Sequence, residues 1–114
     1  MAKISSTTFT TNTTTLLCQI IRPRGLMDWK LMVSAFGTWG GGTMTFQISP
    51  DNGTTKITLD DGNLTYPTNV SLTANRILDI FPASRATHEV PLLLYATLAG
   101  SSGASLTVTV DSTE

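Results

Sequence analysis

Strict alternation of apolar and polar residues is the feature that most constrains how this chain can fold. Every second residue is apolar over residues 43–49 and again over 104–110. The bulky apolar positions in these two segments are Met44, Phe46, Ile48, Leu106, Val108 and Val110. Successive side chains of a β-strand point to opposite faces, so this period of two predicts half-buried strands. No segment of the chain shows a sustained helical period.

Further segments with strand composition are separated by clusters of Gly, Pro, Asn and Asp. They are residues 16–21, 29–36, 54–59, 64–66, 70–73, 76–81 and 90–98. Residues 82–89 have no clear period and have room for one short helical turn. The turn signals recur about every 8 to 12 residues, as in sandwiches and small barrels. We therefore predict an all-β fold with about eight short antiparallel strands in a β-sandwich or jelly roll.

One strong turn joins two of these strands. In Pro50-Asp51-Asn52-Gly53, the proline presets φ for the first turn position, and Asn-Gly supplies positive φ. Residues 43–59 are therefore predicted to form a β-hairpin. The dense apolar run 90–98 is predicted to be a buried strand because it is too short for a typical buried helix and has Pro91 near its start.

The length of 114 residues suits a single domain with its own core. We expect residues 15–114 to form this β-sandwich domain. Residues 1–14 are polar and rich in Thr, with Ile4 and Phe9 as their bulky apolar side chains. This segment is expected to be either a polar N-terminal arm or an edge strand. If it adds a strand to a neighbouring molecule, Ile4 and Phe9 are its predicted contact residues.

Charged residues are few, at 13% of the chain against a usual value of about 25%. The net charge of −1 gives no electrostatic reason to bind nucleic acid or an anionic membrane. The single Cys18 cannot form an intramolecular disulfide and fits synthesis in a reducing cytoplasm. We expect no signal peptide, since Lys3 is followed by polar residues, and no transmembrane helix, since no apolar run reaches about 18 residues.

Residues suited to catalysis or metal binding are scarce. His88 is the only histidine, so any Ser-His-Asp or Cys-His site has to use it. One His and one Cys cannot build a typical zinc site alone. The turn with Asp60, Asp61 and Asn63 offers oxygen ligands to calcium but lacks the EF-hand spacing. We therefore expect no enzyme activity, no metal and no cofactor.

The glycine-rich segment 37–42 lies between two predicted strands. A phosphate-binding loop needs a following helix, so a tight β-connection that uses positive φ at glycine is the better interpretation. Trp39 lies in this loop and is a candidate partner-contact residue, because an exposed aromatic face can stack on a sugar. Trp29 begins an apolar strand and is expected in the core.

Residues 36–55, FGTWGGGTMTFQISPDNGTT, contain a glycine-rich turn followed by the pattern T-x-T-x-Q-x-S-P-D-x-G-T-T. This arrangement resembles small β-sandwich virion structural proteins of tailed bacteriophages. Residues 103–110, GASLTVTV, are similar to the closing strand of the same proteins. Lys56 stands where those proteins usually have a tryptophan. The two motifs together cover about a quarter to a third of the chain.

The resemblance implies a structural protein of the phage particle, and the size suggests a capsid decoration (cement) protein that binds and stabilises the head. The implied partners are the major capsid protein or other virion proteins, with no nucleic acid and no membrane. A homo-oligomer is implied as well, with a trimer on a local threefold as the expected form. The implied location is the capsid surface, after synthesis in the bacterial host cytoplasm. The resemblance implies no catalytic residues.

Two other functions remain open from the sequence. A neck-, tail- or fibre-associated virion protein has the same general character. A carbohydrate-binding or adhesin-like β-sandwich module requires an exposed aromatic platform at Trp39 or Tyr66.

Overall fold

The computed structural model of the chain describes residues 2–20, 31–59, 70–80 and 92–112. These ranges contain β-strands, turns and bends, and no helix. The strands are β1 (Ala2–Phe9), β2 (Thr13–Ile20), β3 (Leu31–Thr38), β4 (Thr43–Ser49), β5 (Ile57–Thr58), β6 (Ser71–Leu72), β7 (Arg76–Ile80), β8 (Leu92–Ala99) and β9 (Ser105–Ser112).

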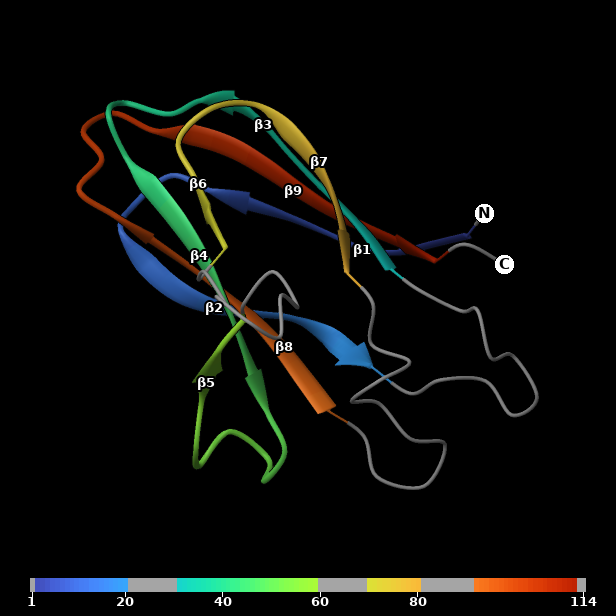
Figure 1. Cartoon of the computed structure of the whole chain (residues 1–114). Coiled ribbons are helices and arrows are strands. Elements are labelled where there is room, and N and C mark those ends of the chain that lie inside the picture. Colours follow the sequence, from blue (N-terminus) through green and yellow to red (C-terminus); the bar gives the residue numbers. More distant parts are fainter. Residues whose placement is uncertain (1, 21–30, 60–69, 81–91, 113–114) are drawn as a thin grey trace, which may run out of the picture.

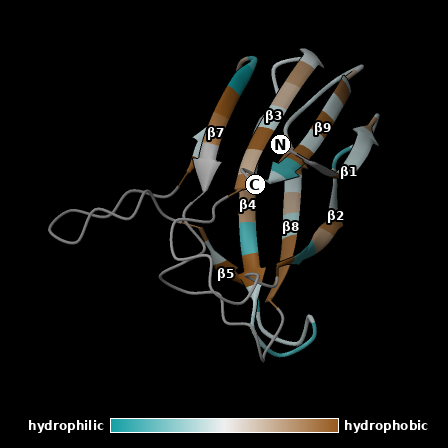
Figure 2. Cartoon of the chain, turned by 90° about the vertical axis from the view of Figure 1, so that its right-hand side faces the viewer, coloured by the Kyte–Doolittle hydropathy of each residue, from teal (hydrophilic) through white to brown (hydrophobic). Residues whose placement is uncertain are grey.

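The strands form two antiparallel sheets that pack face to face (Figure 1). Sheet A has the order β1-β9-β3-β7, and sheet B has the order β2-β8-β4-β5, with β6 also paired to β4. Figure 2 looks along the sandwich from the end that carries the termini and shows the two layers one above the other. The predicted all-β sandwich is therefore confirmed.

The order of pairing is that of a jelly roll. The outermost strands of the chain pair with each other, β1 with β9, and the next pairs inward are β2 with β8 and β3 with β7. At the centre of this nested series β4 pairs with β5 and β6. The nested ribbon folds over itself, and the pairs β3–β9 and β4–β8 join its parts into two sheets.

In the described ranges, nine strand segments occupy eight strand positions, because β5 and β6 pair with different parts of the same edge of β4. β5 pairs with Gln47 and Ile48, and β6 pairs with Met44 and Thr45. Between them, Leu59 donates its backbone N–H to the carbonyl of Phe46 at 2.8 Å. The backbone N–H of Val70 in turn donates to the carbonyl of Leu59 at 2.9 Å, which keeps the two pieces in one line.

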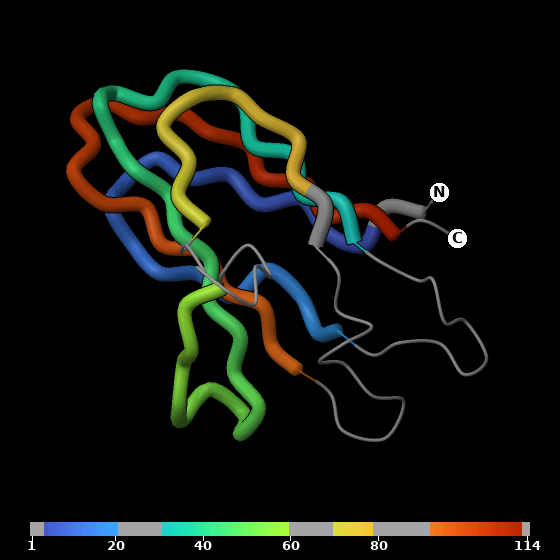
Figure 3. Tube along the Cα trace, in the orientation of Figure 1, coloured from blue at the N-terminus to red at the C-terminus, as the bar shows by residue number. Residues whose placement is uncertain are grey.

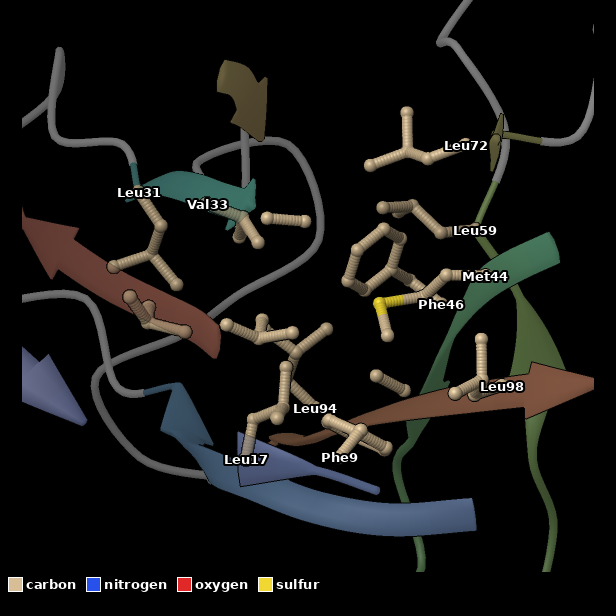
Figure 4. Packing of buried hydrophobic residues seen from close by; sticks show 14 of the residues in the cluster. Phe9, Leu17, Leu31, Val33, Met44, Phe46, Leu59, Leu72, Leu94 and Leu98 are labelled. Carbon is tan, nitrogen blue, oxygen red and sulfur yellow. The ribbon is translucent and has the colours of Figure 1, made fainter. Parts of the chain in front are cut away.

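The core lies between the two sheets and is built from the alternating residues that the sequence indicated. Each of the six bulky apolar positions in 43–49 and 104–110 is buried, as are Leu31, Val33 and Ala35 of β3. Figure 4 shows Leu31 and Val33 facing Phe46 and Leu94 across the sandwich. Each fully buried Leu, Val or Phe contributes about 1.5 to 3 kcal/mol to folding.

The predicted strand positions are largely confirmed, with small shifts at their ends. The 43–59 hairpin is present, with Gln47 opposite Thr58, but its second strand begins at Ile57 and not at residue 54. The reason is the turn itself, which uses the backbone N–H groups of Thr54 and Thr55 for bonds to Asp51. Residues 90–98 were predicted to be a buried strand, and β8 is the central strand between β2 and β4.

The Thr-rich segment 1–14 contains β1, which forms one edge of sheet A, and the start of β2. Its alternation places Phe9 in the core and Ile4 on the surface. The predicted strand at 64–66, the helical turn at 82–89 and Trp29 lie outside the described residues.

Candidate interaction surface

Four turns gather at the end of the sandwich opposite the chain termini (Figure 3). They are residues 10–12 between β1 and β2, 39–42 between β3 and β4, 73–75 between β6 and β7, and 100–104 between β8 and β9. We call this surface the loop end. Hydrogen bonds that run from one turn to another make it a connected unit.

Asn12 ties the first of these turns to the last. Its Oδ1 accepts from the backbone N–H of Ser101 at 2.9 Å and from the Ser101 hydroxyl at 2.6 Å. Its Nδ2 donates to the Ser101 carbonyl at 3.2 Å. One amide side chain thereby satisfies three groups of a residue that is 89 positions away in the sequence. Asn at turn positions commonly bonds backbone groups in this way.

Asn75 fixes the position of Trp39. Its Oδ1 accepts from the indole N–H of Trp39 at 2.9 Å and from the backbone N–H of Gly37 at 3.0 Å. The Trp39 side chain is half-buried and packs against the core cluster. Contacts within the protein therefore occupy the indole N–H and part of the apolar surface of the ring.

The glycine-rich turn is a tight β-connection, as the sequence analysis favoured. Gly37, Gly40 and Gly41 have φ values of 133°, 58° and 79°. A Cβ at Gly40 would clash with the carbonyl oxygen of Ser102, and one at Gly37 would clash with that of Ser105. Gly40 also accepts a bond from the Ser102 backbone N–H at 2.9 Å. Glycine is required at Gly40 because two turns approach each other closely, and at Gly37 because β3 lies close against β9.

The loop end carries no charged residue. Its four turns consist of Thr, Asn, Trp, Gly, Ala and Ser alone, and the nearest charge along the chain is the exposed Arg76. A surface of this kind loses little hydration energy when it is covered, and it is already ordered before it binds. Both properties favour a protein contact, since interface cores are depleted in charge and preordered surfaces lose less entropy on binding.

The three predicted contact residues do not lie together. Trp39 belongs to the loop end, whereas Ile4 is 41% exposed on β1. Phe9 is 1% exposed and fills the core of its own chain, so it offers no surface to a partner. Partner contact stays a prediction for Trp39 and Ile4.

The loop between β4 and β5, which carries the Ser-Pro-Asp-Asn-Gly motif, is bonded within itself. The Ser49 hydroxyl donates to Asp51 Oδ1 at 3.0 Å and accepts from the Gly53 backbone N–H at 2.7 Å. Asp51 Oδ1 also accepts from the backbone N–H of Thr55 at 2.6 Å. This backbone bond holds the pKa of the Asp51 carboxyl below its usual range, and hydroxyls of Thr55 and Ser49 act in the same direction.

The same loop lies over the outer face of sheet B. Lys56 Nζ lies 4.8 Å from the centroid of the Tyr95 ring and donates to the Gly53 carbonyl at 3.2 Å. A Cβ at Gly53 would come within 2.7 Å of the Tyr95 hydroxyl oxygen, which shows how closely the loop approaches β8. Lys56 thus covers the ring of Tyr95 on the outer face of sheet B.

A row of hydrogen-bonded side chains crosses the outer face of sheet B. Thr97 donates its hydroxyl proton to Gln47 Oε1 at 3.0 Å. Because a hydroxyl has one proton, the Thr97 hydroxyl accepts the 2.8 Å hydrogen bond that it shares with Thr14, and the Thr14 hydroxyl donates it. Gln47 Nε2 continues the row to Thr45 at 3.0 Å. The row links β2, β8 and β4 through uncharged side chains.

Sequence reasoning missed two exposed apolar side chains on the outer face of sheet A. Phe36 is 48% exposed and Ile77 is 65% exposed. Ile77 pairs with Ser34, two residues from Phe36 on the same face, so the two are diagonal neighbours. The signal was present, because Phe36 is out of phase with the buried positions of β3. Asn12 and Asn75 were also missed, since nothing local marks an amide that bonds a distant turn.

The described residues hold no group of three or more His, Cys, Asp or Glu side chains that could bind one metal ion. They also contain no helix long and apolar enough to cross a membrane. Burial raises the pKa of the Cys18 thiol from 9.0 to about 11, which keeps it protonated and weakly nucleophilic at neutral pH. His88, Tyr66 and the predicted oxygen ligands Asp60, Asp61 and Asn63 lie outside the described residues.

Comparison with known proteins adds no relative. No protein-family model matches the chain, and searches of curated proteins and of solved structures find no match. Function is therefore inferred from the chain's own geometry and from the resemblance of residues 36–55.

Proposed function

We propose that this chain is a structural virion protein of a tailed bacteriophage, a decoration protein that binds the capsid and stabilises it. The observation that carries the proposal is the loop end, an uncharged surface whose turns are bonded to one another before any partner arrives. The jelly roll supports it, since this architecture is common in viral capsid and lectin domains. Assignment to a phage particle rests on the resemblance of residues 36–55.

The loop end is the surface we assign to the capsid. Its hydroxyl and amide groups offer directional hydrogen bonds, and a partner surface of uncharged polar character fits it best. Contacts of this kind are modest for a single copy. They become strong when a homotrimer engages several capsid sites at once, because each further contact forms at a high effective concentration.

The experiment is a binding assay with purified capsids of the phage that encodes the chain. Thr11 and Ser102 are exposed on the loop end, and Thr54 is exposed on the distant β4–β5 loop. The variants Thr11→Arg and Ser102→Glu are expected to lose capsid binding, while Thr54→Glu binds like the wild type. Capsids without the protein are expected to break at lower temperature or milder osmotic shock. Absence of the wild-type protein from virions would refute the proposal.

Location within the particle separates decoration from the neck or tail alternative. Antibody labelling in electron micrographs is expected over the whole head surface, with many copies per particle. Label confined to the neck or tail would assign the protein there. The solution mass tests the expected trimer independently.

Carbohydrate binding is the second candidate, favoured by the jelly roll of many lectins and by the amide and hydroxyl groups of the loop end. Glycan-array binding that is lost in Trp39→Ala would support it. The half-buried indole, bonded to Asn75, leaves Trp39 less of its face for a sugar than the sequence suggested.

A further inference from the structure

The β4–β5 loop presents an Asn-Gly pair at its tip. Asn52 is exposed with φ of 62°, and Gly53 follows with φ of 93°. Asn-Gly is the sequence most prone to deamidation, because glycine has no Cβ to hinder its backbone nitrogen. That nitrogen attacks Cγ of the asparagine, a C–N bond forms, and the Cγ–Nδ2 bond breaks to release ammonia. Water then opens the cyclic imide to aspartate or isoaspartate.

In the folded chain the attacking nitrogen is held away from this reaction. The Gly53 N–H donates to Ser49 Oγ at 2.7 Å, and the Ser49 side chain is fully buried. The hydroxyl proton of Ser49 is directed to Asp51 Oδ1, so its lone pairs are free to accept from Gly53. Attack requires the Gly53 nitrogen to lose its proton and to turn toward the Asn52 side chain. Both steps break this hydrogen bond.

The other side of Gly53 is fixed as well. Its carbonyl accepts from Lys56 Nζ at 3.2 Å, and the same ammonium lies over the ring of Tyr95. The loop is seated so closely on β8 that the Tyr95 hydroxyl fills the space beside the Gly53 Cα. Rotation of the peptide group into the cyclic geometry therefore requires the loop to leave the sheet.

We propose that Asn52 is a latent deamidation site that Ser49 keeps in its amide form while the chain is folded. Conversion to isoaspartate adds a backbone methylene and a second carboxylate beside Asp51. The Ser49–Asp51–Gly53 hydrogen bonds cannot persist on this lengthened backbone. The rate of deamidation at Asn52 therefore reports how often the β4–β5 loop opens locally.

The experiment incubates the wild-type protein, folded and in denaturant, at mildly alkaline pH. Peptide mass spectrometry follows the mass increase at Asn52 and separates aspartate from isoaspartate. The remaining asparagines, Asn12, Asn63, Asn69 and Asn75, precede larger residues and serve as slow internal references. Asn52 is expected to react slowly in the folded protein and rapidly in the denatured chain.

The Ser49→Ala variant tests the role of the hydroxyl. Loss of the hydrogen bond is expected to accelerate deamidation of the folded protein by about tenfold, which corresponds to the net free energy of one such bond. Asp51→Ala, which frees the Ser49 hydroxyl to rotate, is expected to give a smaller acceleration. Thr54→Ala removes a neighbouring hydroxyl that makes no bond to Gly53 and is expected to react like the wild type.

Global destabilisation is separated from the local effect by a remote variant. Val108→Ala weakens the core in sheet A without touching the loop and is expected to leave the Asn52 rate within about twofold of wild type, less than the change for one lost hydrogen bond. Equal rates in the folded and denatured wild type overturn the proposal. So does a Ser49→Ala rate equal to that of Thr54→Ala or Val108→Ala. If Ser49→Ala does not fold, the rate for Asp51→Ala is compared with the rates for Thr54→Ala and Val108→Ala instead. Equal rates in that comparison also overturn the proposal.

Discussion

The ammonium group of Lys56 lies 4.8 Å from the centroid of the Tyr95 ring, and this contact clamps the β4–β5 loop to the outer face of sheet B. Cation–π contacts at exposed sites contribute about 0.5 to 1 kcal/mol. We expect Lys56→Gln to lower the free energy of unfolding by about this amount in urea titrations. Lys56→Arg keeps the cation and is expected to stay close to wild type. Equal losses in both variants would contradict a cation–π contribution.

Asn75 is predicted to stabilise the protein by holding Trp39 in place at the loop end. Its single Oδ1 satisfies two donors, the Trp39 indole and the Gly37 backbone. Removal of the acceptor in Asn75→Ala is expected to cost about 1 to 3 kcal/mol, since two N–H groups lose their partner. Asn75→Asp retains an oxygen at the same position and should recover much of the stability. Thermal unfolding of the three proteins measures this, and no recovery in Asn75→Asp would argue against the shared acceptor.

The two glycines Gly37 and Gly100 have positive φ but different surroundings. A Cβ at Gly37 would meet the Ser105 carbonyl, whereas one at Gly100 has nothing within 4 Å. Gly100→Ala is therefore expected to cost only the strain of its backbone, about 1 kcal/mol. Gly37→Ala adds overpacking against β9, for a total of about 3 kcal/mol or more. Chemical denaturation of both variants checks the difference, and similar losses would show that backbone strain alone matters.

The thiol of Cys18 is predicted to make stability depend on alkaline pH. Its pKa is raised from 9.0 to about 11 in the folded chain because burial disfavours the thiolate. A group with a raised pKa contributes stability that is present below 9.0 and is lost as pH rises toward about 11. The wild type is thus expected to lose stability over this range relative to Cys18→Ala, measured by urea unfolding at each pH. Alkylation of the folded thiol should be slow throughout, and rapid alkylation at neutral pH would refute the burial.

Asp51 is predicted to make the stability of the protein depend on acidic pH. Its pKa lies below the ordinary value of 3.8, first because the Thr55 backbone N–H bonds to the carboxylate. Its stabilising effect is therefore present above this ordinary value and is lost as pH falls through the lowered one. Carboxyl titration by NMR is expected to place the pKa of Asp51 below the ordinary value of 3.8. A value at or above 3.8 would show that the bond from Thr55 is not kept in solution.

The strands and the buried faces could be predicted from the sequence because both follow from local periodicity. Val33, Phe46 and Val108 are buried where the alternation placed them. The order of the strands could not be predicted from the sequence, because which strands pair is a property of distant segments. The pairing of β1 with β9, for example, brings together residues at the two ends of the chain.

The loop end could not be predicted from the sequence for the same reason. Trp39 was singled out as an exposed aromatic residue, but its exposure is limited by Asn75 in another turn. Asn12 and Ser101 show no local sign that they meet. The SPDNG turn, in contrast, was predicted correctly, since its bonds between Ser49, Asp51 and Gly53 all lie within five residues.

The nested pairing of the strands has a consequence for how the chain acquires its structure. The central hairpin of β4 and β5 closes a short loop, whereas β1 pairs with β9 across almost the whole chain, with Ala2 opposite Ser112. Loop-closure entropy delays such distant pairings, and folds dominated by them fold on the millisecond to second scale. The chain is therefore expected to fold slowly from its centre outward, and its two terminal strands are expected to join sheet A last.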